Sequence, residues 1–265
     1  MGIKISVAGA TGWTGRPVAE AVHAAEDLDL VAGVSRSAAG RDLGEVWGGE
    51  LNGVPVRRTV EEALDGVAVL IDYTAHDAVR EHILTALEHG VAVVVGTSGL
   101  TGADYAQIDA LAHERGVGVV AAGNFSITAA LAQAAALLAA RHLPSWEVID
   151  YASETKPDAP SGTALELAER LAQVQPPAVA LPVAQTAGLV EARGGSVSGG
   201  QVHSLRLPGF TLSTEVIFGL PDERLSIRHD AGTSAAPYVA GTLLAARAVM
   251  GRVGLTRGLD QLLLS

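Results

Sequence analysis

Residues 3–15 read IKISVAGATGWTG, a short apolar strand that runs directly into a turn with three glycines. Arg16 and Pro17 follow and suit the first turn of a helix, where the missing N–H of proline costs nothing. A strand, a glycine-rich turn and a helix begin a βαβ unit, and the bare backbone of such a turn can hold a pyrophosphate. The spacing is G-x-x-G-x-x-G instead of the commoner G-x-G-x-x-G, so an ordinary tight turn is the alternative.

The chain continues with short apolar strands that alternate with helices. We expect strands at 28–34, 67–71, 91–95 and 118–121, and helices around 61–64, 78–89 and 102–114. This alternation predicts an α/β fold with a doubly wound parallel sheet, a Rossmann-like dinucleotide-binding domain. Ligands of such sheets lie outside the carboxyl ends of the strands, where the small and polar turns of this chain occur.

The end of the second predicted strand carries Ser35, Arg36 and Ser37. An NAD-binding domain of this type places a carboxylate there, on the ribose 2′-hydroxyl. Two hydroxyls and a guanidinium suit a 2′-phosphate instead, so the sequence predicts NADPH in preference to NADH. The alternative is that Arg36 is a solvated loop charge.

From residue 127 onward the pattern changes to a second domain. We expect helices at 127–141 and 163–173, a loose segment at 175–192, strands at 146–151, 202–207, 211–218 and 223–230, and hairpin-type turns at Pro208-Gly209 and Pro221-Asp222. Runs of strands predict an α+β domain with a mainly antiparallel sheet. A helix at 237–250 and the tail after it are expected to return to the first domain. The predicted division is therefore 1–126 with 238–265, and 127–237.

The stretch KPDAPSGTA at 156–164 combines one cation with a helix start. Two prolines stiffen the loop that bears Lys156, and Ser161 or Thr163 can cap the following helix. A helix start attracts anions, so an ammonium beside it predicts a carboxylate receptor. Only Lys4 and Lys156 are lysines among the 18 basic residues. Because lysine can release a proton near neutral pH and arginine cannot, Lys156 is a candidate catalytic residue, with an ordinary loop lysine as the alternative.

Composition narrows the classes of function. The chain has 265 residues, of which 48% are hydrophobic and 18% charged, so a compact globular protein is expected. A net charge of −11 argues against nucleic acid and anionic membranes as partners. The absence of cysteine and of a signal-peptide pattern is consistent with a cytoplasmic protein. The spacing of His, Asp and Glu suits no zinc site, so no metal is expected.

The nonamer at 156–164 resembles the signature of the dihydrodipicolinate reductase (4-hydroxy-tetrahydrodipicolinate reductase) family. The turns at 9–15, 72–74, 96–99 and 123–126 resemble family turns as well, although Thr14 stands where the family usually has methionine. Together with the end of the second strand, the resemblance implies a cofactor site made of Gly9, Thr11, Gly12, Trp13, Thr14, Gly15, Ser35, Arg36, Ser37, Tyr73, Thr74, Gly96, Thr97, Ser98, Asn124, Phe125 and Ser126.

The resemblance implies reduction of 4-hydroxy-tetrahydrodipicolinate to tetrahydrodipicolinate in the diaminopimelate route to lysine, with NADPH as cofactor and NADH as the alternative. Ser161, Gly162 and Thr163 would hold one carboxylate of this small dicarboxylate. Lys156 would contact the substrate and supply positive charge or a proton. The resemblance also implies a homo-oligomer, a tetramer.

One departure bears on the chemistry. Bacterial members usually carry two histidines four and three residues before the lysine, and here those positions are Ala152 and Ser153. Either Lys156 or a bound water donates the proton, or the protein acts on a different cyclic imine or imino acid, or it is a non-catalytic NADP-binding regulator. Glu154 and His203 are the candidate substitutes, although His203, like His229, suits a structural role better.

Overall fold

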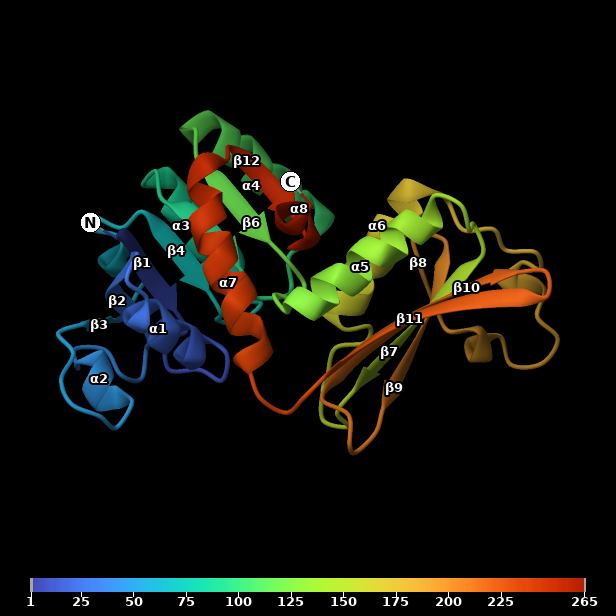
Figure 1. Cartoon of the computed structure of the whole chain (residues 1–265), viewed down its shortest axis with the longest axis horizontal. Coiled ribbons are helices and arrows are strands. Elements are labelled where there is room, and N and C mark those ends of the chain that lie inside the picture. The colour runs from blue at the N-terminus through green and yellow to red at the C-terminus, as the bar shows by residue number, and fades with distance from the viewer. Residues whose placement is uncertain (1, 265) are drawn as a thin grey trace. The chain divides into compact units, whose positions relative to one another are not determined.

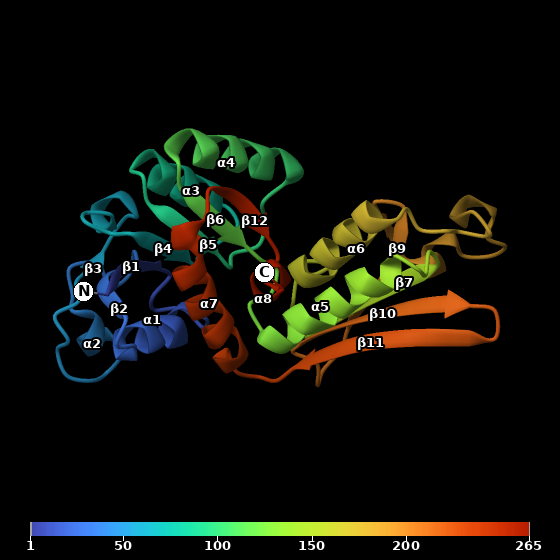
Figure 2. The same ribbon diagram turned by 45° about the horizontal axis from the view of Figure 1, so that its top comes forward.

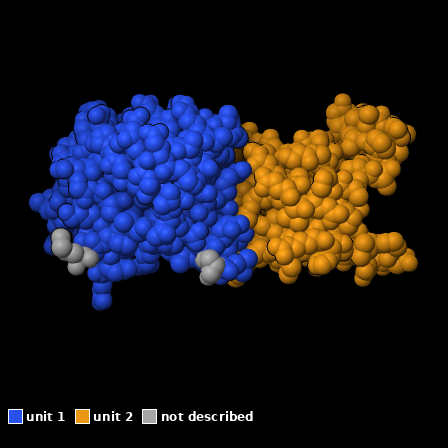
Figure 3. Space-filling model, turned by 90° about the horizontal axis from the view of Figure 1, so that it is seen from above, with its two compact units in different colours: residues 1–127, 235–265 blue, residues 128–234 orange. Residues whose placement is uncertain are grey.

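The computed structural model describes residues 2–264. The chain divides into two compact units, residues 1–127 with 235–265 and residues 128–234, which Figure 3 colours separately. No helix within the described residues is long and apolar enough to cross a membrane.

The first unit is built on a seven-stranded sheet. Its strands are β1 (Ile3–Ala8), β2 (Leu28–Val34), β3 (Val56–Arg57), β4 (Val69–Asp72), β5 (Ala92–Val95), β6 (Gly118–Ala121) and β12 (Gly254–Arg257). They lie in the order β12-β6-β5-β4-β1-β2-β3, and every neighbouring pair is parallel. The predicted doubly wound sheet is confirmed. The order of strands reverses between β1 and β4, which is where such sheets bind their ligands.

Helices cover both faces of this sheet (Figure 2). They are α1 (Gly15–Ala24), α2 (Leu43–Val46), α3 (Val79–Glu88), α4 (Gly102–Arg115), α7 (Ala236–Ala248) and α8 (Asp260–Leu263), with single 3₁₀ turns η1 (Glu61–Ala63) and η4 (Val249–Gly251). Helix α3 packs on α4, and α1 packs on α7. The strands between them are apolar on both faces, as in β5, where all four residues are buried.

Two strands of this sheet were not predicted. β3 has only two residues, too few for a pattern to appear. β12 lies in the tail that was expected only to pack back on the first domain, and it extends the sheet beside β6. Its sequence, GLTR, is only partly buried and lacks the apolar run of the other strands.

The second unit contains the other sheet (Figure 1). Its strands are β7 (Trp146–Ala152), β8 (Gly195–Val197), β9 (Gly200–Arg206), β10 (Leu212–Leu220) and β11 (Glu223–Ala231); its helices are α5 (Ile127–Ala140) and α6 (Gly162–Val174), with 3₁₀ turns η2 (Val183–Gln185) and η3 (Val190–Arg193). The order is β11-β10-β7-β9-β8, and all pairs are antiparallel except β7 with β9. The mainly antiparallel sheet is therefore confirmed.

Of the two predicted hairpins in this unit, one is wrong. Pro221 and Asp222 do join the paired strands β10 and β11, and a proline followed by a residue of positive φ, 65° at Asp222, is the pattern of a type II turn. Pro208 and Gly209 join β9 to β10, which do not pair with each other because β7 lies between them. The connection therefore crosses an intervening strand, which a local turn signal cannot reveal.

The core of the second unit lies between its sheet and its helices. Residues at alternate positions of β7 are buried, among them Trp146 and Val148. They pack with Leu167 and Leu171 of α6 and with Ala136 of α5 in one cluster. This core fixes the start of α6 relative to the end of β7.

Candidate functional site

The glycine turn at 9–15 is closed by glycines that tolerate no side chain. Gly9 has φ of +81°, and a Cβ atom there would lie 2.1 Å from the carbonyl oxygen of Tyr73. A Cβ atom on Gly15 would lie 2.1 Å from the carbonyl oxygen of Gly9. Gly12 N–H donates to the same oxygen at 2.8 Å. The turn is thus a bare backbone loop at the start of α1, as a pyrophosphate site requires.

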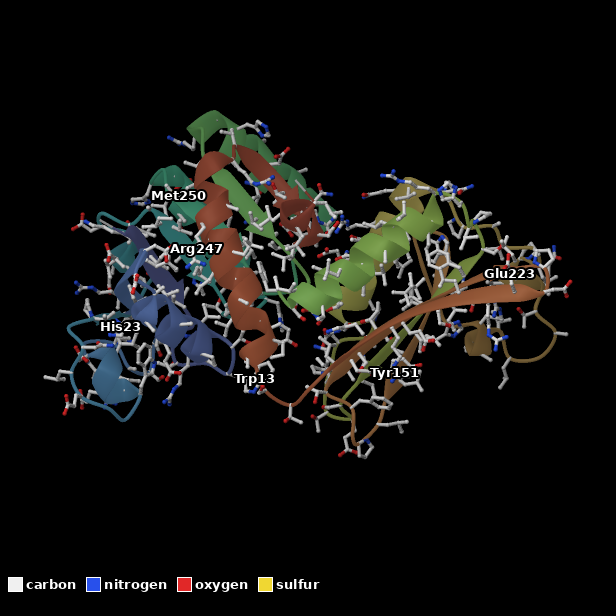
Figure 4. All side chains as sticks on the ribbon, in the orientation of Figure 1. Trp13, His23, Tyr151, Glu223, Arg247 and Met250 are labelled. Carbon is white, nitrogen blue, oxygen red and sulfur yellow. The ribbon has the colours of Figure 1, made fainter. Side chains whose placement is uncertain are left out.

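Trp13 and Thr14 complete this turn. Thr14 is the N-cap of α1, and its side chain accepts no hydrogen bond from the backbone N–H groups of the first helical turn. The side chain of Trp13 is 57% exposed, and its ring meets the ring of Tyr238 edge-on with centroids 6.0 Å apart. Figure 4 shows Trp13 beside the start of α7, the helix that carries Tyr238.

The ends of β1, β2 and β4 border a cavity of about 560 Å³. The predicted residues Thr11, Ser35 and Ser37 form a hydroxyl chain here, with Oγ1 of Thr11 3.0 Å from Oγ of Ser35, which is 3.3 Å from Oγ of Ser37. The lining of the cavity includes Gly9, Ser35, Arg36, Ser37, Arg58, Glu61, Thr74, Glu81 and His82. Arg58 and His82 were missed by the sequence analysis. Arg58 follows β3, the strand too short to predict, and its exposed guanidinium lines the same cavity as that of Arg36.

Beside this cavity, the buried carboxylate of Asp72 organises two turns. It accepts hydrogen bonds from the Thr97 hydroxyl at 2.6 Å and the Thr74 hydroxyl at 2.7 Å. The N–H of Thr74 donates to the Thr97 hydroxyl at 2.8 Å, and Nδ1 of His82 lies 2.8 Å from Asp72 Oδ2. Asp72 therefore fixes the ends of β4 and β5 and the orientation of His82. The signal that could have indicated this contact in the sequence was an acid at the end of a strand followed by a histidine on the next helix.

The ring of Tyr73 lies against Gly96. A Cβ atom on Gly96 would lie 2.1 Å from the Tyr73 ring, so only glycine lets the ring lie across the end of β5. The Tyr73 hydroxyl lies 2.6 Å from Oγ1 of Thr242 on α7, and burial raises the pKa of Tyr73 far above its usual range. The phenol is therefore neutral at all physiological pH values. Ser98, in the same turn as Gly96, is exposed.

The turn after β6 packs against the turn after β4 through aromatic rings. Phe125 and Ser126 are buried, and the Phe125 ring meets that of Tyr73 edge-on with centroids 6.2 Å apart. Oδ1 of Asn124 accepts from the Ser126 N–H at 2.8 Å, whereas its Nδ2 is buried without a partner among the described residues. The three predicted turns at 72–74, 96–99 and 123–126 thus meet at one edge of the sheet, since β4, β5 and β6 are neighbours.

In the second unit, the loop before α6 carries the predicted cation. Nζ of Lys156 lies 2.7 Å from Oδ1 of Asp158. Ser161 is the N-cap of α6 and accepts from the Ala164 N–H at 3.4 Å. Gly162 and Thr163 form the first turn of the helix and are partly exposed.

Ser161 itself is only 1% exposed. Its N–H donates to Asp150 at 2.8 Å and its hydroxyl donates to the same carboxylate at 2.6 Å. Both donors of Ser161 are thus directed into the protein. The helix start, and not this side chain, is what a ligand could reach.

The residues at the two histidine positions and the candidate substitutes for those histidines have different surroundings. Ala152 is buried, and the Ser153 hydroxyl lies 3.0 Å from that of Thr155. Glu154 is exposed. Nε2 of His203 lies 2.7 Å from Oε2 of Glu147. His203 is therefore part of an ion-pair cluster instead of projecting from the loop.

The surroundings of Glu147 favour its ionised form. Burial tends to raise the pKa of Glu147, but hydrogen bonds from Arg193 and His203 outweigh it and hold the pKa below its usual value. The other histidine that the sequence suggested as structural is His229. It lies on β11, with Nε2 3.1 Å from the Thr128 hydroxyl. Both histidines occupy structural positions.

Two protein-family models match successive parts of the chain. Residues 3–125 match the family described as dihydrodipicolinate reductase, N-terminus, and residues 124–263 match dihydrodipicolinate reductase, C-terminus. The chain belongs to the dihydrodipicolinate reductase family. Both halves of the family architecture are present, one following the other along the chain.

Relatives of this reductase family span the same length. The 4-hydroxy-tetrahydrodipicolinate reductase of Thermosynechococcus vestitus is 37% identical over 98% of this chain and 97% of that protein. The enzyme of the same name from Halalkalibacterium halodurans is 36% identical over 98% of this chain and 99% of that protein. A solved structure, dipicolinate-bound dihydrodipicolinate reductase from Paenisporosarcina sp. TG-14, matches with a TM-score of 0.77 and 31% identity, covering 98% and 99% of the two chains.

Proposed function

We propose that this protein reduces 4-hydroxy-tetrahydrodipicolinate to tetrahydrodipicolinate with NAD(P)H in the diaminopimelate route to lysine. The observation that carries the proposal is the full-length match with reductases of that name. The described residues offer two sites of suitable chemistry, a bare glycine turn for a dinucleotide and a lysine beside a helix start for a dicarboxylate.

The residues of the first unit fit a dinucleotide. Side chains are excluded from Gly9 and Gly15, which leaves backbone N–H groups at the start of α1 for the pyrophosphate. The turns that carry Thr74, Thr97 and Asn124 would lie around the cofactor, the last two of them near the nicotinamide. When bound, the reduced dinucleotide supplies the hydride for the reaction. The protein holds the cofactor in position and excludes water around it.

NADPH is the preferred cofactor in this proposal. Arg36 and Arg58 line the cavity at the end of β2, where an NAD-specific site would place a carboxylate on the ribose. The hydroxyls of Ser35 and Ser37 lie beside them. Guanidinium groups are well suited to bind a phosphate through two hydrogen bonds. Glu61 and Glu81 also line the cavity and would oppose a phosphate, so the two arginines must outweigh them.

The substrate would bind at the start of α6. The N–H groups of Gly162 and Thr163 belong to the first helical turn and favour a carboxylate together with the helix dipole. Lys156 would contact the substrate through its ammonium group. Ser161 contributes through its position as the cap. Dipicolinate, the ligand of the related Paenisporosarcina reductase, is a dicarboxylate of the size that such a site would take.

Lys156 is also the proposed proton donor. Ala152 cannot donate a proton, and the Ser153 hydroxyl is engaged with Thr155. Lys156 is the cation of this loop and would protonate the acceptor nitrogen. A water molecule bound in place of the missing histidines is the alternative donor.

The second unit would also serve oligomerisation, as a homotetramer. Several leucines of its strands are at least a third exposed, including Leu205 on β9, Leu220 on β10 and Leu225 on β11. Apolar side chains on a sheet favour a partner subunit. Light scattering coupled to gel filtration tests this, and a mass of one chain would contradict it.

The reaction is tested with purified protein, NADPH and the product of dihydrodipicolinate synthase. Turnover in the wild type that Lys156→Ala abolishes, while NADPH binding persists, supports the proposal. Turnover of another cyclic imine but not of this product would identify a different reductase. Binding of NADPH without turnover of any imine would identify a regulator. Activity retained by Lys156→Ala but lost in His203→Ala would overturn the assigned roles.

A further inference from the structure

Asp150 is an acid on the apolar face of a central strand. In β7 alternate residues are buried, and Asp150 shares this face with Trp146, Val148 and Ala152. The side chain is 0% exposed. A buried carboxylate loses free energy of hydration and is retained only where hydrogen bonds compensate it. Its partners therefore indicate what the residue does.

Every hydrogen bond described for this carboxylate comes from Ser161 or from β9. Ser161 donates its N–H to Oδ2 at 2.8 Å and its hydroxyl to Oδ1 at 2.6 Å. From β9, the Ser204 hydroxyl donates to Oδ2 at 3.1 Å and Nη2 of Arg206 donates to Oδ2 at 2.8 Å. Nη2 of Arg206 also donates to the carbonyl oxygen of Asp158, two residues after Lys156.

These contacts hold two points of the loop that bears the proposed substrate site. One is Ser161, the cap of α6, and the other is the backbone of Asp158, whose side chain pairs with Lys156. If Asp150 served only to attach α6 to the sheet, these bonds to the loop would not be needed, because α6 already packs on the sheet through Leu167 and Leu171. The bonds of Asp150 instead fix the direction of the first N–H groups of α6 and, through Arg206, the backbone of the loop at Asp158.

We propose that Asp150 is a positioning residue of this reductase: it acts through Ser161 and Arg206 to hold the helix start and the lysine loop in the geometry that binds a dicarboxylate. The inference rests on the proposed function. Asp150 does not itself contact the substrate. Its loss is expected to weaken substrate binding while leaving the cofactor site of the other unit unchanged.

The test is Asp150→Asn. This substitution keeps the shape of the side chain, replaces one carboxylate oxygen with an NH2 group that donates, and removes the negative charge that faces Arg206. Because charge-assisted hydrogen bonds are lost, we expect the KM for substrate and the Kd for dipicolinate to rise about tenfold to a hundredfold. The Kd for NADPH is expected to be unchanged, and kcat to change much less than KM.

Glu166→Gln is the matched control. Glu166 is also a buried carboxylate of the second unit, 6% exposed; its Oε1 lies 3.5 Å from Nη1 of Arg170 on α6 and accepts from Gln133 on α5 at 3.1 Å. Both variants are expected to lower the melting temperature, and only Asp150→Asn to raise KM. Equal KM values in the two variants would reduce Asp150 to a structural acid and overturn the inference.

The double variant with Ser161→Ala tests the route of the effect. If Asp150 acts through Ser161, the two substitutions raise the Kd for dipicolinate by less than the product of their separate effects; a full product overturns this route. Should Asp150→Asn not fold, Ser161→Ala alone decides, and an unchanged Kd refutes the inference.

Calorimetric binding of dipicolinate separates this inference from the proposed function. Wild-type protein that binds dipicolinate but turns over no substrate contradicts the function alone, and the Asp150→Asn comparison still decides the inference. Normal turnover with an Asp150→Asn variant that binds dipicolinate as tightly as the wild type contradicts the inference alone. A wild type that binds no dicarboxylate overturns both.

Discussion

Nζ of Lys156 lies 2.7 Å from Oδ1 of Asp158, so the cation of the loop before α6 has its own counter-ion. The two side chains are 31% and 40% exposed, and ion pairs of this kind contribute little to stability because water screens them. In the proposed substrate site the pair would matter for binding instead. A carboxylate ligand that binds Lys156 would have to compete with Asp158 for the ammonium group.

Asp158→Asn is therefore expected to strengthen the binding of dipicolinate. Removing the competing charge should lower the Kd about twofold to fivefold, in line with the small energy of an exposed pair. Calorimetry at low and high ionic strength measures this, and the gain should shrink with salt. Asp222→Asn changes the net charge equally in the hairpin turn between β10 and β11 and serves as the control. A weaker affinity in Asp158→Asn would mean that Asp158 orients Lys156 instead of competing for it.

Arg36→Ala is expected to remove the preference for NADPH. Loss of a charge-assisted hydrogen bond to a phosphate, about 1.5–3 kcal/mol, corresponds to a rise of roughly tenfold to a hundredfold in the KM for NADPH. The KM for NADH should change little, because NADH lacks the 2′-phosphate. Arg58→Ala should act in the same direction. Arg41, whose Nη2 lies 3.0 Å from Glu45 Oε1 and which is absent from the cavity lining, is the control.

Gly15→Ala and Gly102→Ala form a matched pair, because each glycine is the first residue of a helix. A Cβ atom on Gly15 would lie 2.1 Å from the Gly9 carbonyl oxygen, whereas one on Gly102 meets nothing within 4 Å. We expect Gly15→Ala to abolish NADPH binding and to lower the melting temperature. Gly102→Ala should leave both unchanged or raise stability slightly, since alanine favours helix. Equal NADPH affinities in the two variants would show that the glycine turn is not the cofactor site.

How much the sequence could predict depends on how local each signal is. The glycine turn and the apolar strands predicted the doubly wound sheet because both patterns lie within a few consecutive residues. β12 was not predicted because it pairs with β6 from a distant part of the chain, and its side chains at 255–257 are only partly buried. The connection at Pro208-Gly209 was misread because strand order, which places β7 between β9 and β10, is not a local property.

The candidate site divides in the same way. Residues in turns were predicted from short local signals, Ser35 from its place at the end of a strand and Thr97 from a turn that resembles one of the family. The acids that hold these turns were not predicted. Asp72 and Asp150 bond to residues on other elements, and an acid within a strand sequence looks the same whether it faces water or the core. Their roles follow from tertiary contacts alone.

Asp42 leads to a prediction about acid stability. Its carboxylate is the N-cap of α2 and accepts backbone N–H bonds from Asn52 at 3.0 Å, Gly53 at 2.8 Å and Gly44 at 2.9 Å. The bond from Asn52, with the other backbone donors, lowers the pKa of Asp42 below its usual 3.8.

A carboxylate with a lowered pKa in the folded state stabilises the protein above its unfolded pKa, and this contribution disappears as the pH falls through the folded pKa. Asp42→Asn is therefore expected to lower the melting temperature most at pH 5 to 7. The difference from wild type should narrow as the pH falls below 3.8, where the unfolded carboxyl is protonated. Melting curves from pH 7 to pH 3 measure this, with the exposed Asp65→Asn as the charge control. A difference that stays constant across this range would mean that Asp42 acts through its shape and not through its ionised form.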